Sequence, residues 1–322
     1  MMLSRTAFEA DLKTSYLPLT KRLTKVENQI QRLIIRAMAN AKLSTTYWNS
    51  IRRELDVLYA KMNGIFRSWA IDEIPGGYKR SAKLIHKRID AMKTVLNKAG
   101  KTSAQLLHGN ASMQIMRGLY STSVDSFLSA SVAGRQNLRN LFIRTQQKLV
   151  EESLINVAVG TGFEMGNLQE AQSLLSSIFR SPEWNIVTEK RFIQAGRYKY
   201  KPSYYAQMVA RTKFHQGQSQ AALVQAANYD TDLIQISAHN TTTQLCMDFE
   251  GKIFSVSGKD KRFPLLTESP PFHPNCLHLM FPTFEGAMVV QGTLESFSAF
   301  SRGEISRPPL PSRYIPVEKR VT

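Results

Sequence analysis

The sequence predicts a mainly α protein, in which an extended N-terminal helical hairpin or bundle is followed by a small α+β C-terminal domain and an extended tail. Three observations lead to this prediction. Apolar residues recur every three or four positions through the first hundred residues, short alternating segments follow residue 229, and prolines gather after residue 300. We expect four parts: a basic helical hairpin or bundle at 1–110, a helical middle region at 111–202, the α+β domain at 203–288 and a Pro-rich tail at 289–322.

Two amphipathic helices are predicted first. After Pro18, apolar residues recur at steps of four and three, at Leu19, Leu23, Val26, Ile30, Leu33 and Ala37. Ser44 or Thr45 can cap the second helix. Its apolar seam follows a three-four repeat at Trp48, Ile51, Leu55, Leu58, Met62, Ile65 and Trp69.

The second helix is expected to end at Pro75-Gly76-Gly77, because proline lacks an amide hydrogen and glycine disfavours a helix interior. A third helix should then run to Gly100. Its apolar face consists of Ile85, Ile89, Met92 and Leu96. Short connections between such helices favour antiparallel neighbours, and hence a hairpin or bundle.

The middle region is predicted to hold two more helices. The first is marked by Met116, Leu119, Val124, Phe127 and Leu128, and the second by Leu138, Leu141, Phe142, Leu149, Leu154 and Ile155. The glycines of VAVGTGFEMGN should interrupt the second. Asn167 and Glu170 then resemble the capping box of a further helix. Residues 181–202 are predicted to form a basic, aromatic connection ending in YKYKPS.

The C-terminal part changes from helical to strand-like patterns. Ser203 can cap a helix over residues 203–227. The segments DLIQISAH, GKIFSV and LHLMF are strand candidates, and KDKRFPLLTESPP is a polar, proline-rich loop. The segment after residue 300 has four prolines and little apolar periodicity, so we expect it to be extended, either disordered or lying on a neighbouring molecule.

The positive charge of the chain is concentrated at its N-terminus. The net charge is +17, from 42 Lys and Arg against 25 Asp and Glu. Residues 1–110 contain 20 basic and 8 acidic side chains, a surplus of 12, whereas the other 212 residues have 22 and 17, a surplus of 5. This segregation favours contact with nucleic acid or an acidic protein surface, although solvated lysine-rich helices would show the same surplus.

Cytosolic synthesis and no membrane contact are expected from the chain. Arg5, Glu9 and Asp11 interrupt any N-terminal signal-like segment, and no apolar run approaches the roughly 18 residues of a membrane span. The two cysteines, Cys246 and Cys276, are too few for a secreted disulfide framework. They can form one bridge, share a metal ion, or remain free thiols.

Four candidate metal ligands lie in the C-terminal domain: Cys246, His273, Cys276 and His278. Their spacing is C-x26-H-x2-C-x-H, and Pro274-Asn275 favours a tight turn that brings the last three ligands together. Two cysteines and two histidines match the nitrogen and sulfur ligands that Zn²⁺ takes in a tetrahedral site. Zinc is therefore the candidate cofactor, with Asp248 as a reserve oxygen ligand.

Other interpretations of these residues stay open. Cys246 and Cys276 can be buried reduced thiols or a disulfide, and His278 can be a satisfied histidine on a strand. A catalytic thiol would need a base and an oxyanion donor, and no third orienting group accompanies the Cys276–histidine pairs. A zinc-dependent nuclease or toxin-like enzyme would use His239 and Asp248 with the cluster. A coiled-coil DNA-binding protein is a further alternative.

The order of motifs from Arg211 to Phe281 resembles the minor head proteins of tailed bacteriophages, the Mu F-like head morphogenesis family. The resemblance is carried by SAHNTTTQLCMDFEGKIF followed by PPFHPNC, and it extends over residues 140–285. Members often have C-x-x-C in the first turn and H-P-x-C-R-C in the second. Here Phe249 replaces a cysteine, and Leu277 and His278 replace the arginine and the last cysteine. Lys213 stands where a glutamate is common.

The resemblance implies a structural role without catalysis. It predicts a minor capsid protein of the virion, in the capsid interior or at the portal vertex, made in the cytoplasm of a bacterial host. The implied partners are the portal protein, packaged double-stranded DNA, and the major capsid or scaffold protein, with several copies per particle. The implied function is head assembly or DNA packaging and delivery.

Overall fold

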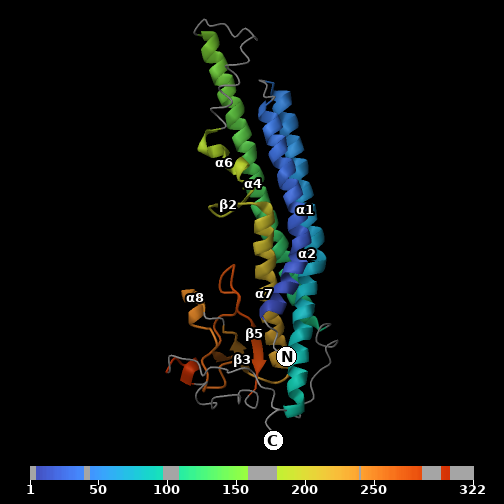
Figure 1. Cartoon of the computed structure of the whole chain (residues 1–322), viewed down its shortest axis with the longest axis vertical. Coiled ribbons are helices and arrows are strands. Elements are labelled where there is room, and N and C mark those ends of the chain that lie inside the picture. The colour runs from blue at the N-terminus through green and yellow to red at the C-terminus, as the bar shows by residue number, and fades with distance from the viewer. Residues whose placement is uncertain are drawn as a thin grey trace. The chain divides into compact units, whose positions relative to one another are not determined.

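The structure, a computed structural model, describes residues 5–39, 44–96, 109–158, 180–238, 241–284 and 299–304. Four long helices provide most of its secondary structure: α1 (Arg5–Ala39), α2 (Thr45–Leu96), α4 (Asn110–Ala158) and α7 (Pro202–Asn228). Figure 1 shows them as long ribbons, and the strands among the described residues are short and all follow residue 190. The predicted mainly α class, with long N-terminal helices followed by a small domain of short strands, is confirmed.

The shorter elements form two small antiparallel sheets. A 3-10 turn, η1 (Pro182–Trp184), and α6 (Asn185–Thr188) precede the hairpin β1 (Ile193–Ala195) and β2 (Tyr198–Tyr200). The second sheet has the order β4-β3-β5, from β3 (Leu233–Ile236), β4 (Ile253–Ser255) and β5 (Met280–Thr283), with α8 (Gln244–Met247) between β3 and β4. Its central residue Ile234 pairs with Phe254 and Pro282.

The chain divides into two compact units, each assembled from distant segments. Unit 1 comprises residues 1–15, 70–123 and 208–322, and unit 2 comprises residues 16–69 and 124–207. Each long helix contributes residues to both units. The four-part division expected from the sequence stays a prediction about which parts fold independently.

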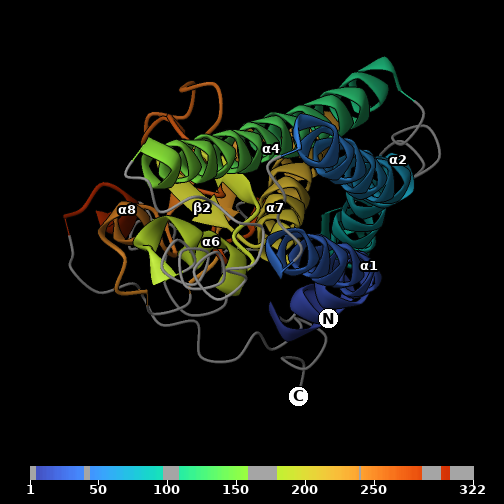
Figure 2. The ribbon, with the colours of Figure 1, turned by 90° about the horizontal axis from the view of Figure 1, so that it is seen from above.

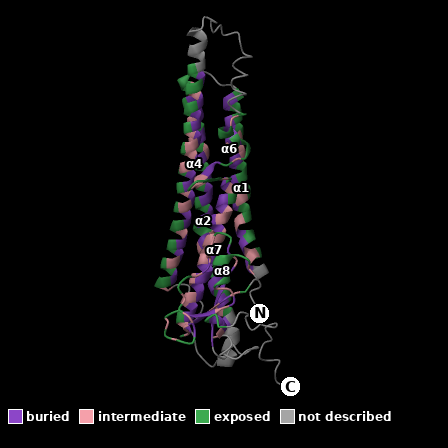
Figure 3. Ribbon diagram, turned by 90° about the vertical axis from the view of Figure 1, so that its left-hand side faces the viewer, coloured by how far each residue is buried: buried purple, intermediate pink, exposed green. Residues whose placement is uncertain are grey.

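Unit 2 is built on the apolar faces predicted from the helical repeats. All six seam residues from Leu19 to Ala37 are buried, and in the next seam only Leu58 is half-exposed, where Tyr59 takes the buried position. Figure 3 shows buried positions recurring along the helices with exposed positions between them. Aromatic contacts join the helices: Phe66 stacks on Phe127 at 4.1 Å, and Phe142 contacts both Trp48 and Trp184.

The β1–β2 hairpin lies alongside α4 in unit 2 (Figure 2). The Tyr59 hydroxyl of α2 donates a hydrogen bond to the backbone oxygen of Phe192 at 2.6 Å. A Cβ on Gly134 of α4 would lie 2.0 Å from that same oxygen, so glycine is needed for this close approach. Asn137 of α4 and Gln194 of β1 are joined by a side-chain hydrogen bond. The base of the hairpin is therefore fixed to two helices.

Unit 1 shows why the predicted helix end at Pro75-Gly76-Gly77 is wrong. α2 continues through these residues to Leu96, so the predicted third helix is part of the second. A Cβ on Gly77 would lie 2.5 Å from the ring of Phe214 in α7, and Ile74 and Tyr78 on either side are buried. The glycine therefore serves close packing. The free energy gained by burying the neighbouring side chains outweighs the free-energy cost of proline and glycine inside a helix.

Three other boundaries differ from expectation. α1 begins before Pro18, and α4 is one helix where two were predicted. α7 begins at Pro202, and the Ser203 amide donates to the buried Glu27 carboxylate of α1 at 2.5 Å, so Glu27 takes the capping role expected of Ser203. The predicted helix end at Gly100, the interruption at residues 159–167, the capping box at Asn167 and the tail beyond residue 304 lie outside the described residues.

The three-stranded sheet of unit 1 is attached to α7 by a polar side chain. The buried Gln218 amide donates to the Met280 carbonyl at 2.6 Å and accepts from the Met280 amide at 3.0 Å. Residues 299–304 also reach this sheet, where the Ser301 hydroxyl accepts the amide of Ile253 at 2.9 Å. Both contacts satisfy backbone groups at sheet edges, which would otherwise be exposed.

A matched pair of glycine substitutions in α4 tests the close approach in unit 2. We expect Gly134→Ala to lower the free energy of unfolding by at least about 2 kcal/mol, because the new methyl group meets the Phe192 carbonyl. Gly118→Ala, where nothing lies within 4 Å, should raise it by up to about 1 kcal/mol. Urea unfolding followed by circular dichroism measures both. Equal effects of the two substitutions would contradict the packing argument.

Candidate metal centre

The first predicted ligand, Cys246, is held by the short helix α8. The Cys246 amide donates to the Thr243 carbonyl at 2.9 Å, and its own carbonyl accepts from the amides of Phe249 and Glu250. The Cys246 side chain is 1% exposed. The turn thus points a buried thiol away from solvent while its neighbours Leu245 and Met247 are exposed.

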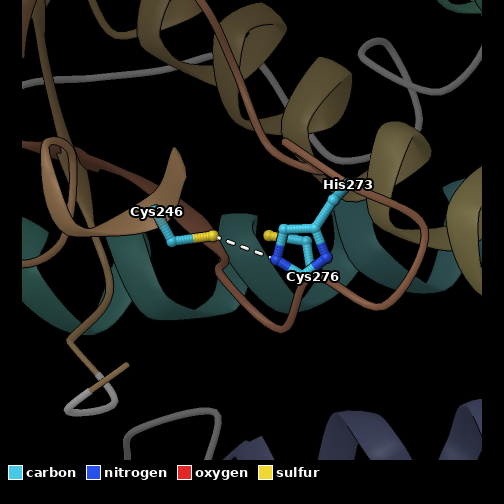
Figure 4. A group of neighbouring side chains, drawn as sticks. All are labelled: Cys246, His273 and Cys276. Carbon is cyan, nitrogen blue, oxygen red and sulfur yellow. Dashed lines mark hydrogen bonds between the residues drawn. The ribbon is translucent and has the colours of Figure 1, made fainter. Parts of the chain in front are cut away.

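The other ligands lie on the loop that precedes β5, which α7 holds in place. The Ser219 hydroxyl donates to the Pro270 carbonyl at 2.7 Å, and the Thr212 hydroxyl donates to the Pro274 carbonyl at 3.4 Å. A tight turn follows, in which the Cys276 amide donates to the His273 carbonyl at 2.9 Å. This is the turn that Pro274-Asn275 predicted, and it places His273 and Cys276 on one side of the loop (Figure 4).

Three of the four predicted ligands converge in the structure. One ligand atom from each of Cys246, His273 and Cys276 lies within 4.8 Å of the others. The His273 Nε2 atom is 3.2 Å from the Cys246 Sγ atom (Figure 4). Ligand atoms around a tetrahedral zinc ion are roughly 3.3–3.8 Å apart, as follows from bond lengths of about 2.0–2.3 Å. The group is therefore close to the dimensions of a zinc site.

The fourth predicted ligand, His278, lies beside this group. Its Nδ1 atom is 3.5 Å from the Cys276 Sγ atom, and its Nε2 atom is 3.7 Å from the Glu250 Oε1 atom. Glu250 is itself fixed, since its Oε2 atom accepts the Thr241 amide at 2.9 Å. A carboxylate on the far nitrogen of a histidine orients the ring and sets its tautomer, which is the usual second partner of a metal-bound histidine.

The environment favours a neutral Cys246 thiol when no cation is bound. Burial, followed by the neighbouring Cys276 and Glu250, raises the pKa of Cys246 to about 12. A divalent cation supplies the positive charge that would let both sulfurs bind as thiolates. The two sulfurs and the His273 imidazole of this group suit Zn²⁺ more than Mg²⁺ or Ca²⁺, which prefer oxygen ligands.

An aromatic group lies beside His278. The ring of Phe249 stacks on Phe272 at 4.4 Å and lies 5.7 Å from Phe254, while Phe272 lies 6.2 Å from the His278 ring. Phe249 stands where related proteins often have a second cysteine of the first turn. In this chain the position holds an apolar ring that belongs to this aromatic group.

The proximity of Cys246, His273 and Cys276 agrees with the prediction, whereas the acidic residues differ from it. The proposed reserve ligand Asp248 is exposed and outside the group of three, and His239 lies outside the described residues. Glu250, which the sequence gave no reason to single out, is the carboxylate that contacts His278. Its position four residues after Cys246, one helical turn further on, is the signal that could have identified it.

Comparison with known proteins agrees with the motif order. The sequence profile of the family described as phage minor capsid protein 2 matches residues 23–304. Neither the search of curated proteins nor the search of solved structures gives a match. Among the described residues, none of the helices is long and apolar enough to cross a membrane. The match covers most of the chain and is consistent with the predicted phage minor head protein: the chain belongs to the phage minor capsid protein 2 family.

Proposed function

We propose that this protein is a virion component attached to the portal vertex, where it aids head assembly or DNA packaging and delivery without catalysis. The observation that carries the proposal is the family match over residues 23–304, which includes both the long helices and the cysteine-histidine domain. We expect several copies per particle, arranged around the portal. At that place the protein would be within reach of the major capsid or scaffold protein and of packaged double-stranded DNA.

The portal contact is proposed for the basic N-terminal helices. Residues 1–110 contain 20 Lys and Arg against 8 Asp and Glu. On α1, Lys21, Arg22 and Lys25 are all exposed and lie within one turn of each other. Such a concentrated positive surface is expected to bind an acidic partner most tightly, because opposite charges attract and bound counterions are released.

The cysteine-histidine cluster supports a structural role more than an enzymatic one. A catalytic zinc site keeps an open position for water beside a base. Here Cys246, Cys276 and His278 are buried, and the nearest carboxylate, on Glu250, contacts the far nitrogen of His278. We propose that the site is a closed zinc centre that joins α8 to the loop before β5.

Metal analysis tests the zinc centre. We expect freshly purified protein to contain one zinc ion per chain, and Cys276→Ser to lose it because a sulfur ligand is removed. Glu250→Gln should keep the ligands and weaken binding by about 10- to 100-fold, since only the orienting carboxylate changes. Met247→Ser is the control, because Met247 is next to Cys246 and 50% exposed. Elemental analysis and chelator competition measure these effects.

The alternatives for the two cysteines give different results. Fresh wild-type protein without stoichiometric zinc would contradict the metal proposal. Alkylation followed by mass spectrometry would then distinguish a Cys246–Cys276 disulfide from two free thiols, because only free thiols are modified in unfolded, unreduced protein.

Co-purification tests the portal contact. When the protein is produced with the portal protein of the same phage, we expect the two to elute as one large complex. Replacing Lys21, Arg22 and Lys25 by glutamate should weaken capture at least about tenfold at low salt, because three attractive charges become repulsive.

The uncharged substitution Thr24→Gln on the same exposed face is the matched control and should leave capture unchanged. A protein that stays free of the portal and cleaves DNA would refute the proposal in favour of a nuclease. A protein that binds duplex DNA but no portal would favour the coiled-coil DNA-binding alternative.

A further inference from the structure

The β1–β2 hairpin of unit 2 borders an open cleft of about 610 Å³. The hairpin turns at Gly196, whose φ of +57° is favourable for glycine, and Gln194 pairs with Lys199 across the strands. Its base is fixed by the contacts of Phe192 with Tyr59 and Gly134. The cleft is therefore bordered by a hairpin that the helices hold in place. The sequence predicted a basic, aromatic connection here and no hairpin.

Three tyrosines form a row along this cleft. Tyr198 and Tyr200 alternate along β2 and so share a face, with ring centroids 6.3 Å apart. Tyr204 in the first turn of α7 continues the row, 6.2 Å from Tyr200 with the two rings inclined by only 22°. Tyr198 is 53% exposed and Tyr204 is 50% exposed. The row therefore presents aromatic surface to solvent at both ends.

Four cations line the same cleft: Arg191, Arg197, Lys199 and Lys201. Arg191 is paired with Glu189 at 2.6 Å, and Arg197 lies over the ring of Tyr198 at 5.0 Å. Within the described part of the chain, no carboxylate forms an ion pair with Arg197, Lys199 or Lys201. From residue 190 to residue 207 the sequence has five Lys or Arg and no Asp or Glu. The surface is thus strongly positive.

The two nearby acidic residues leave Arg197, Lys199 and Lys201 without a charge partner among the described residues, since Glu189 pairs with Arg191. Glu27 is buried, and its carboxylate accepts the amide of Ser203 at the start of α7. It therefore satisfies the N-terminus of α7 instead of facing the exposed lysines. The cations of the hairpin therefore remain available to bind an anion from outside the chain.

We propose that this hairpin binds single-stranded nucleic acid, with its lysines and arginines on the phosphates and its tyrosines stacked on unpaired bases. A groove of positive charge combined with a row of exposed aromatic rings is how proteins bind single strands without sequence preference. Duplex DNA hides its base faces inside the helical stack, so it would use only the charges. An acidic peptide would likewise leave the tyrosine faces unused. The tyrosine row is therefore what favours a single strand.

Binding of a fluorescent 20-nucleotide oligothymidylate to the full-length protein tests this proposal. Tyr198→Ala combined with Tyr204→Ala should weaken binding at least about tenfold, since each lost base stack costs about 1–3 kcal/mol. The same pair should change binding of a duplex less than about twofold. Lys199→Gln combined with Lys201→Gln should weaken both ligands and lower the slope of log affinity against log salt by about 1.4 for the single strand.

Lys259→Gln combined with Lys261→Gln removes the same charge from exposed positions of unit 1 and is the matched control, expected to change oligothymidylate binding less than about twofold. Circular dichroism checks that every variant is folded. The proposal is overturned if the tyrosine pair binds oligothymidylate like wild type, if duplex binds more tightly than single strand, or if polyglutamate of equal charge binds as tightly. It does not rest on the portal contact, because loss of portal capture would leave these measurements unaffected.

Discussion

Close contact at glycines inside long helices is the constraint on which the rest of the structure depends. In unit 1, Gly77 of α2 lets the ring of Phe214 in α7 approach its backbone, and in unit 2, Gly134 of α4 does the same for the carbonyl of Phe192. Each contact fixes an element that carries chemistry. Phe214 lies on the helix that holds the cysteine-histidine loop, and Phe192 directly precedes the basic hairpin. A side chain at Gly134 would have to displace the backbone at Phe192, and one at Gly77 would have to displace the ring of Phe214.

The same contacts explain which parts of the fold could be predicted from the sequence. Helix faces follow from the local repeat, and the seams beginning at Leu19 and Trp48 are buried almost completely as predicted. The helix end predicted at Pro75-Gly76-Gly77 is wrong, because propensities read from neighbouring residues treat glycine as a helix terminator. The role of Gly77 is set instead by its contact with Phe214, more than a hundred residues away. The two-stranded hairpin was missed because YKYKPS is too short and too polar to show a buried face.

In the candidate metal centre too, features set by neighbouring residues could be predicted from the sequence, whereas those set by distant residues could not. His273, Cys276 and His278 lie within six residues, so a turn was enough to predict their proximity, and Cys246 was the one remaining cysteine. Glu250 was not singled out because its significance depends mainly on His278, 28 residues later, and on the Thr241 amide that fixes it. In the proposed zinc centre, Phe249 and Glu250 would have complementary roles, one excluding water and the other orienting a ligand.

The ion pairs of unit 2 determine which of its lysines and arginines remain available to bind an anion. Asp56 of α2 lies between Arg135 and Arg139 of α4, Glu54 pairs with Arg36, and Glu183 lies 3.9 Å from Arg144. Exposed ion pairs of this kind contribute little to stability, about 0–1 kcal/mol each. They do cancel charge along the helices, whereas the hairpin has no such partners for Arg197, Lys199 or Lys201 among the described residues. When Lys or Arg side chains bind a phosphate chain, they release its counterions, and this release favours binding. Cations that are already paired with carboxylates contribute less to it. In the proposal above, the hairpin can therefore bind a single strand even though it is a much smaller element than the lysine- and arginine-rich helices.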